Sequence, residues 1–164
     1  MKFNIKILVR LALFAAISII LGKFLQIPIG DSIRISFENL PIILAGFLYG
    51  PFAGALCGAV ADILGCLFKG YSINPIITVA AAIIGFCAGV FGKCGFFKKP
   101  RLLLSVYSAH ILGSMIIKSV GLYIYFATPP AVLAWRIPLY IAIGALEYML
   151  IRFCLNHKGL KELL

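Results

Sequence analysis

The stretch RISFENLPIILAGFLYGPFAGALCGAVADILGCLF, residues 34–68, decides the fold of this chain, because two apolar arms meet within it at Tyr49-Gly50-Pro51. Glycines recur every four residues through it, at positions 46, 50, 54 and 58. On helices this spacing lets two backbones approach closely. Asp62 lies inside the second apolar arm. Because a carboxylate within hydrocarbon is costly, its presence there indicates a functional site.

The composition of the chain indicates an integral membrane protein. Its 164 residues are 63% hydrophobic and 12% charged, with a mean hydropathy of +1.10, which is too apolar for a soluble domain of this size. The apolar run at 5–25 is long enough to span a bilayer and has no small-residue cleavage site before Pro28, so we expect it to be retained. The five cysteines have no C-x-x-C spacing and are interpreted as reduced packing residues.

The apolar runs predict six helices in one integral membrane domain, residues 1–164, at roughly 20 residues for each membrane-spanning helix. The predicted fold class is therefore an all-α membrane protein. Breakers such as Gly50-Pro51, Asn74-Pro75 and Pro129-Pro130 separate the runs, and the second run is short for a complete span. The predicted helices are approximately 5–25, 39–50, 52–69, 75–92, 102–126 and 138–155.

The net charge of +10 reflects membrane topology and contact with lipid headgroups, not nucleic-acid binding, because the basic residues cluster at span ends. With six helices both termini lie on one side of the bilayer, and that side collects ten of the fifteen lysines and arginines. The positive-inside bias predicts that both termini are cytoplasmic and that the loops at 26–38, 70–74 and 127–137 lie outside. The ten bases are Lys2, Lys6, Arg10, Lys93, Lys98, Lys99, Arg101, Arg152, Lys158 and Lys161.

A set of polar residues remains that topology does not explain, and most of its members belong to the outer half of the protein. Such convergence is what a pocket open to the exterior needs. The set comprises Arg34, Glu38, Asn39, Asp62, Tyr71, Asn74, Lys118, Arg136 and Glu147.

Lys118 and Asp62 are the two members of this set that lie deepest in apolar sequence. Lys118 either extends its stem to the outer interface, binds a ligand anion or pairs with an internal acid. Asp62 either bonds to a neighbouring helix, with Lys118 as one candidate partner, or accepts two parallel N–H bonds from an amino-pyrimidine edge. The residues alone leave these alternatives open.

No catalytic group or metal site is predicted. His110 and His157 have no carboxylate or second histidine at helical spacing and are interpreted as packing or surface residues. The chain has no G-x-x-x-x-G-K-[ST] phosphate loop and no H-E-x-x-H or G-x-S-x-G element. We therefore expect no enzymatic activity and no cofactor, and energy for any transport must come from a partner or an ion gradient.

The first predicted helix carries a strip of small residues. Ala12 and Ala16 stand one turn apart with Ala15 beside them, flanked by large aliphatic side chains. Small residues at this spacing permit close helix contact, either within the protein or with another membrane subunit.

The chain resembles the substrate-binding S components of energy-coupling factor (ECF) vitamin transporters, and most closely the folate subfamily. The run RISFENLPIILAGFLYGPFAGALCGAVADILG is similar to that subfamily's R-[LI]-S-F…P-I-x-L-A-G-x-L-[FY]-G-P…G-A-[LV]-A-D-x-[LI]-G pattern. The Ala12-x-x-x-Ala16 strip, Lys118-Ser-Val-Gly-Leu and Arg136-Ile-Pro also resemble elements of the family. Asp31-Ser32 and Glu38-Asn39 are more acidic and polar than the folate pattern, so a pterin-like or deazapurine-like base without a glutamate tail fits almost as well.

The resemblance implies a non-enzymatic capture subunit in the cell membrane, with a pocket on the extracellular side. It implies delivery of folate or a related pterin through a membrane T subunit and two cytoplasmic ATPases, with Ala12 and Ala16 contacting the T subunit. Riboflavin, thiamine, a queuosine precursor and a non-transporting membrane scaffold are the alternatives. The residues expected to bind the substrate are Arg34, Phe37, Asn39, Asp62, Tyr71, Asn74, Lys118 and Arg136.

Overall fold

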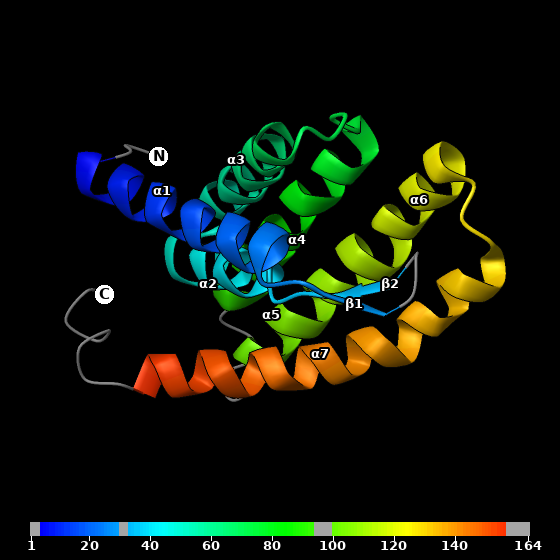
Figure 1. The fold of residues 1–164 in the computed structure, drawn as a ribbon. Coiled ribbons are helices and arrows are strands. Elements are labelled where there is room, and N and C mark those ends of the chain that lie inside the picture. Colours follow the sequence, from blue (N-terminus) through cyan, green and yellow to red (C-terminus); the bar gives the residue numbers. More distant parts are fainter. Residues whose placement is uncertain (1–3, 30–32, 94–99, 157–164) are drawn as a thin grey trace.

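The computed structural model describes residues 4–29, 33–93 and 100–156. Almost all of the described chain is helical, and Figure 1 shows its elements in sequence colours. Two of the helices contain π-helical segments, η1 and η2, that continue from the preceding α-helix without a break. The elements are α1 (Ile5–Ile19), η1 (Ile20–Phe24), β1 (Ile27–Ile29), β2 (Ile33–Ile35), α2 (Asn39–Tyr49), α3 (Pro51–Lys69), α4 (Pro75–Lys93), α5 (Arg101–Ala109), η2 (His110–Ile117), α6 (Lys118–Phe126) and α7 (Pro130–Asn156).

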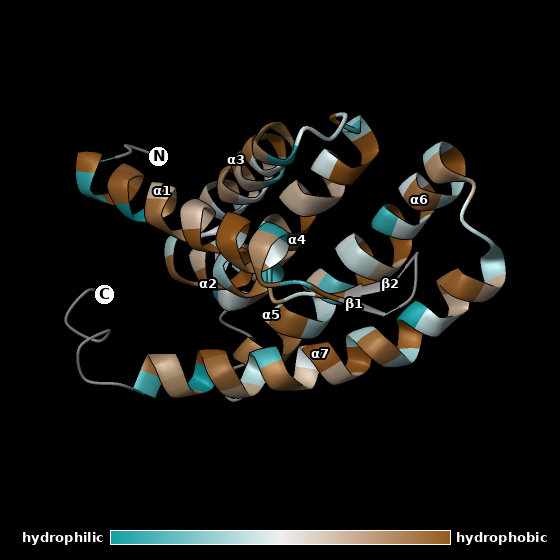
Figure 2. Ribbon diagram, in the orientation of Figure 1, coloured by the Kyte–Doolittle hydropathy of each residue, from teal (hydrophilic) through white to brown (hydrophobic). Residues whose placement is uncertain are grey.

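Five helical segments of the described chain are long and apolar enough to cross a membrane, whereas α2 has only 11 residues. Hydrophobic residues run along most of each helix in Figure 2. Many large apolar side chains are exposed, as a lipid-facing surface requires. That the chain crosses the bilayer six times, with both termini inside, stays a prediction. The five segments are 5–24, 51–69, 75–93, 101–126 and 130–156.

Helices α2, α3 and α4 form the most closely packed part of the structure, and glycines permit the contact. A Cβ atom on Gly54 would collide with the carbonyl oxygen of Gly85, and one on Gly85 would collide with that of Gly54. Gly46 also faces the Gly85 carbonyl, and Gly58 faces Ala81 in the same way. The four-residue glycine spacing therefore does what the sequence predicted: it brings helix backbones into direct contact.

A short antiparallel hairpin occupies part of the region that the sequence predicted as an outer loop. Strands β1 and β2 pair Ile27 with Ile35 and Ile29 with Ile33. The hairpin lies between the end of the α1–η1 helix and α7 (Figure 1). Pairing gives the backbone N–H and C=O groups of this connection partners that an open loop would lack.

The last helix begins at Pro130, so the predicted start at 138 and the outer loop at 127–137 are wrong. Ala127 ends α6 in the left-handed conformation, with φ 48°. Proline is tolerated in the first turn of a helix, where its missing N–H has no intrahelical partner to lose. Pro138 lies inside α7. Arg136, assigned to a loop from the sequence, is therefore a helical residue.

Replacing Gly85 with valine is expected to destabilise the protein by about 1–3 kcal/mol or more, because the new side chain would overlap the α3 backbone. Thermal unfolding of the purified protein in detergent measures the loss. Ala142→Val is the matched control, since Ala142 lies on the exposed face of α7. Equal melting temperatures for the two variants would show that the α3–α4 contact is not tight.

Candidate functional site

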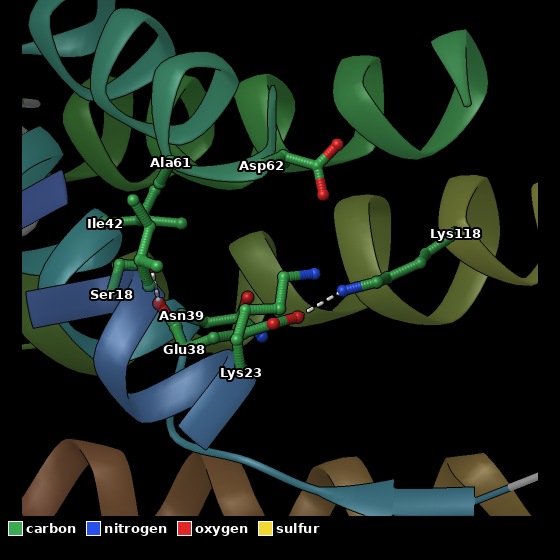
Figure 3. Close-up of a pocket in the computed structure, with 10 residues that line it drawn as sticks. Ser18, Lys23, Glu38, Asn39, Ile42, Ala61, Asp62 and Lys118 are labelled. Carbon is green, nitrogen blue, oxygen red and sulfur yellow. Dashed lines mark hydrogen bonds and ion pairs between the residues drawn. The ribbon is translucent and has the colours of Figure 1, made fainter. Parts of the chain in front are cut away.

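A small cavity lies where the α1–η1 helix, α2, α3, α4 and α6 converge (Figure 3). Its volume is about 20 Å³, and about 10–15 Å³ is the minimum that one water molecule needs. Six of the ten side chains around it are polar or charged. They come from segments far apart in the sequence: Ser18, Ile19, Lys23, Glu38, Asn39, Ile42, Ala61, Asp62, Ala81 and Lys118.

An ion pair between Lys118 and Glu38 joins α6 to the residue that precedes α2. Both side chains are about one-fifth exposed, at 18% and 21%. Figure 3 shows the lysine reaching across the cavity to the carboxylate. Lys118 thus pairs with an internal acid, one of the predicted alternatives, but that acid is Glu38 and not Asp62. The predicted candidate pair of Asp62 with Lys118 is wrong.

Asp62 points from α3 toward the cavity (Figure 3) and accepts a hydrogen bond from a hydroxyl. Thr78 on α4 donates its Oγ1–H to Asp62 Oδ2 at 2.7 Å. The close glycine contact between α3 and α4 makes this short bond possible, because it sets the two helices side by side. A carboxylate has about four lone-pair positions, so this bond leaves acceptor capacity for a ligand.

Lys23, at the end of η1, supplies the second base beside the cavity. Its ammonium lies 5.9 Å from the centroid of the Tyr71 ring, within cation–π range. A Cβ on Gly65 would lie 2.7 Å from Lys23 Cε, so the lysine stem packs directly on α3. Among the residues that line the cavity, two bases therefore face two acids.

A second, buried polar cluster lies beside the cavity. His110 Nε2 and Glu147 Oε2 are 2.8 Å apart, and both side chains have zero exposure. His110 Nδ1 lies 3.4 Å from Ser114 Oγ, and Asn39 donates its Nδ2–H to that same hydroxyl at 3.3 Å. Because Asn39 also lines the cavity, it connects the two polar groups.

Arg136 belongs to this second cluster. Its Nη2 donates to the backbone oxygen of Ser114 at 3.1 Å and to the Tyr140 hydroxyl at 3.3 Å. In the described part of the chain, Arg136 Nε and Glu147 Oε1 are buried without a hydrogen-bond partner. Ser114 lies in the π-helical segment η2, and such segments occur frequently at functional sites.

The described residues contain no group of three or more potential ligands that could hold a metal ion.

The family model for "ECF transporter, substrate-specific component" matches residues 6–155. The chain belongs to this family. It is accordingly a multi-pass protein of the cell membrane, and its family is one of transporter components, not of enzymes.

Two relatives agree with this assignment, and a solved structure shares the fold. The folate transporter FolT of Clostridium novyi is 28% identical over 124 residues, covering 74% of this chain and 70% of that protein. The thiamine transporter ThiT of Bacillus subtilis is 32% identical over 123 residues, and the match spans 66% of this chain and 63% of that transporter. The crystal structure of FolT bound with folic acid superimposes with a TM-score of 0.73 at 22% identity, covering 92% of this chain and 93% of FolT.

The predicted site residues of this S component do not all meet in one place. Asn39, Asp62 and Lys118 line the cavity, and Tyr71 is linked to it through Lys23.

The other predicted site residues lie elsewhere. Arg136 lies in the second cluster, and Phe37 does not line the cavity. Asn74 caps α4, because its Oδ1 accepts from the backbone N–H of Ile76 at 3.0 Å. Arg34 belongs to β2, and its side chain lies outside the described part of the structure.

Sequence reasoning missed two important roles. Glu38 stood among the unexplained polar residues but was not assigned to the site, although it is the partner of Lys118. His110 was interpreted as a packing or surface residue because no carboxylate lies at helical spacing from it. Its partner Glu147 is 37 residues away on α7. One sequence signal did point to this pair: Glu147 was among the polar residues that membrane topology does not explain.

The buried His110–Glu147 pair is expected to couple α5–η2 to α7 energetically. Glu147→Leu and His110→Leu each leave one buried polar partner unsatisfied, which costs about 1–3 kcal/mol. The double variant removes both partners, so it is expected to lose less stability than the sum of the single variants. Thermal unfolding in detergent of the natural protein, the two single variants and the double variant measures these losses of stability. Losses that simply add in the double variant would show that His110 and Glu147 do not stabilise each other.

Proposed function

We propose that this S component captures folate or a related pterin from the extracellular side. It then delivers the vitamin inward by associating with a membrane T subunit and two cytoplasmic ATPases. The observation that carries the proposal is the Asp62 carboxylate, held by Thr78 and facing a cavity inside an apolar bundle. The folate transporter relative supports the choice of ligand class.

Asp62 suits an amino-pyrimidine edge. Such an edge presents two parallel N–H donors, and a planar carboxylate accepts them with both oxygens. The hydroxyl of Thr78 holds the carboxylate orientation through Oδ2. Asn39, whose amide reaches the same cavity, is the second proposed contact to the ring.

Binding a vitamin requires this cavity to open. Pockets for molecules of that size are roughly 300–1,000 Å³, whereas the cavity measures about 20 Å³. The Lys118–Glu38 pair and the Ser18 hydroxyl close it on the side of the α1–η1 helix. We infer that the ligand enters by parting that helix and the β1–β2 hairpin from α3 and α6. Arg34, Phe37 and Tyr71, in or near this region, are proposed to contact the rest of the ligand.

A second candidate is another flat heterocyclic vitamin, such as thiamine, riboflavin or a queuosine precursor. The similarity to the thiamine transporter favours it. The Asp62 carboxylate also suits any ring that presents N–H donors. The scaffold alternative required Asp62 and Lys118 to neutralise each other, but Lys118 pairs with Glu38 instead.

Ala12 and Ala16 are proposed to form the T-subunit contact. Both are exposed on α1, whereas Ala15 is buried in the core. Exposed apolar side chains, including Leu8, Leu13 and Ile17, surround them. Small residues on such a face allow another membrane helix to approach closely.

Asp62→Asn is expected to weaken binding of a pterin by about tenfold or more, because a bond to a charged acceptor contributes about 1.5–3 kcal/mol. Equilibrium dialysis of the detergent-purified protein measures the dissociation constant. Thr78→Val keeps the charge and removes only the orienting hydroxyl, so its loss should be smaller. An unchanged affinity for Asp62→Asn, in a variant of normal melting temperature, would exclude Asp62 from the site.

Ala16→Trp is expected to leave vitamin binding intact but to abolish uptake and co-purification with the T subunit, because the indole keeps the two helices apart. Uptake is measured in cells that produce the T subunit and both ATPases. Ala142→Trp, on the exposed face of α7, is the matched control and should retain uptake. Normal uptake by Ala16→Trp would refute the docking assignment.

A further inference from the structure

Lys118 is one of two bases that line the cavity, and its ammonium is already paired with an acid of the same chain. The ammonium bonds to Glu38 Oε1, and no other acid of the described chain forms an ion pair with it. The pair is largely shielded from water, with side-chain exposures of 18% and 21%. A charge pair in such surroundings is costly to separate unless each partner gains a replacement.

Glu38 is held in place by its surroundings. The Ser18 hydroxyl donates to its backbone carbonyl at 2.6 Å. Gly22 in η1 leaves room for its side chain, because a Cβ there would lie 2.5 Å from Glu38 Oε2 and 2.6 Å from Glu38 Cβ. The α1–η1 helix therefore keeps the carboxylate aimed at Lys118.

The charges around the cavity balance. Lys23 and Lys118 are the bases among its lining residues, and Glu38 and Asp62 are the acids. An entering ligand carboxylate would meet the negative charge of Asp62, and to bond Lys118 it would have to displace Glu38. A neutral ring with N–H donors brings no carboxylate to compete with Glu38 for Lys118, and Asp62 offers it free acceptor positions. Electrostatic repulsion is stronger here than in water, since the effective dielectric constant is lower.

We propose that Glu38 is a specificity-determining residue that, by occupying Lys118, makes the cavity select an uncharged amino-heterocycle over carboxylate-bearing forms of the same ring. This inference rests on the proposed function and sharpens its substrate class. Glu38 then competes with ligand carboxylates for the ammonium group of Lys118. If the pair were merely structural, its removal would change the affinity for all ligands alike and would leave their ranking by affinity unchanged.

The test compares pterin, pteroic acid and folic acid, which share the same bicyclic ring and carry zero, one and two carboxylates on the groups attached to it. Equilibrium binding is measured on the detergent-purified protein and on Glu38→Gln. Releasing Lys118 should strengthen binding of pteroic and folic acids by about tenfold or more, the effect of one charge-assisted bond. Binding of pterin should change by less than about threefold. The double variant Glu38→Gln/Lys118→Met should lose the gain.

An unchanged ranking of the three ligands in Glu38→Gln, or a uniform loss of affinity, would overturn the proposal. Benzoate, a carboxylate without the pterin ring, separates this failure from failure of the proposed function. Millimolar benzoate should raise the melting temperature of Glu38→Gln and not that of the natural protein. If no pterin binds either protein, the folate assignment fails, while the benzoate result still decides the role of Glu38. Equal benzoate responses would refute it.

Discussion

The structure depends on direct backbone contact between three helices, and glycine makes that contact possible. Where α3 crosses α4, Gly54 and Gly85 face each other's carbonyl oxygens with no room for a Cβ atom. Helices brought this close place short side chains within bonding distance, as with Thr78 and Asp62. In a bilayer, where burial of apolar surface does not drive helices together, such packing is a main source of association. The cavity lies beside this contact because α2, α3 and α4 supply half of its wall.

Polar side chains within the bundle pair with one another because burial removes them from bulk solvent. Each charged group in the interior faces another polar group, as with Lys118 and Glu38 or His110 and Glu147. The pairs join helices distant in sequence, and Asn39 links the two groups through Ser114. A membrane protein that only needed stability could have used apolar residues at these positions. Retaining charges there, in a protein of a transporter family, is consistent with a site that exchanges internal partners for those of a ligand.

Much of the helical architecture could be predicted, and the errors have local causes. The α2–α3 turn was predictable because Gly50-Pro51 breaks a long apolar run. The start of α7 was wrong because Pro129-Pro130 and Arg136 resemble a loop, although proline fits a first helical turn and Arg136 is satisfied by Ser114 and Tyr140. The hairpin at 27–35 was missed because its strands have only three residues each. The capping of α4 by the Asn74 side chain was also missed, and the assignment of Asn74 to the substrate stays a prediction.

The sequence by itself determined that this chain is an apolar helical protein of the membrane, that glycines bring its helices together, and that Asp62 and Lys118 lie within apolar stretches of sequence. Composition, breakers and spacing are local properties, so they can be read from neighbouring residues. Only the tertiary structure decided which charges meet. Glu38 and Lys118 are 80 residues apart, and His110 and Glu147 are 37 apart. No periodicity connects such positions, because the geometry of helix crossings, not the order of residues, sets the distance between them.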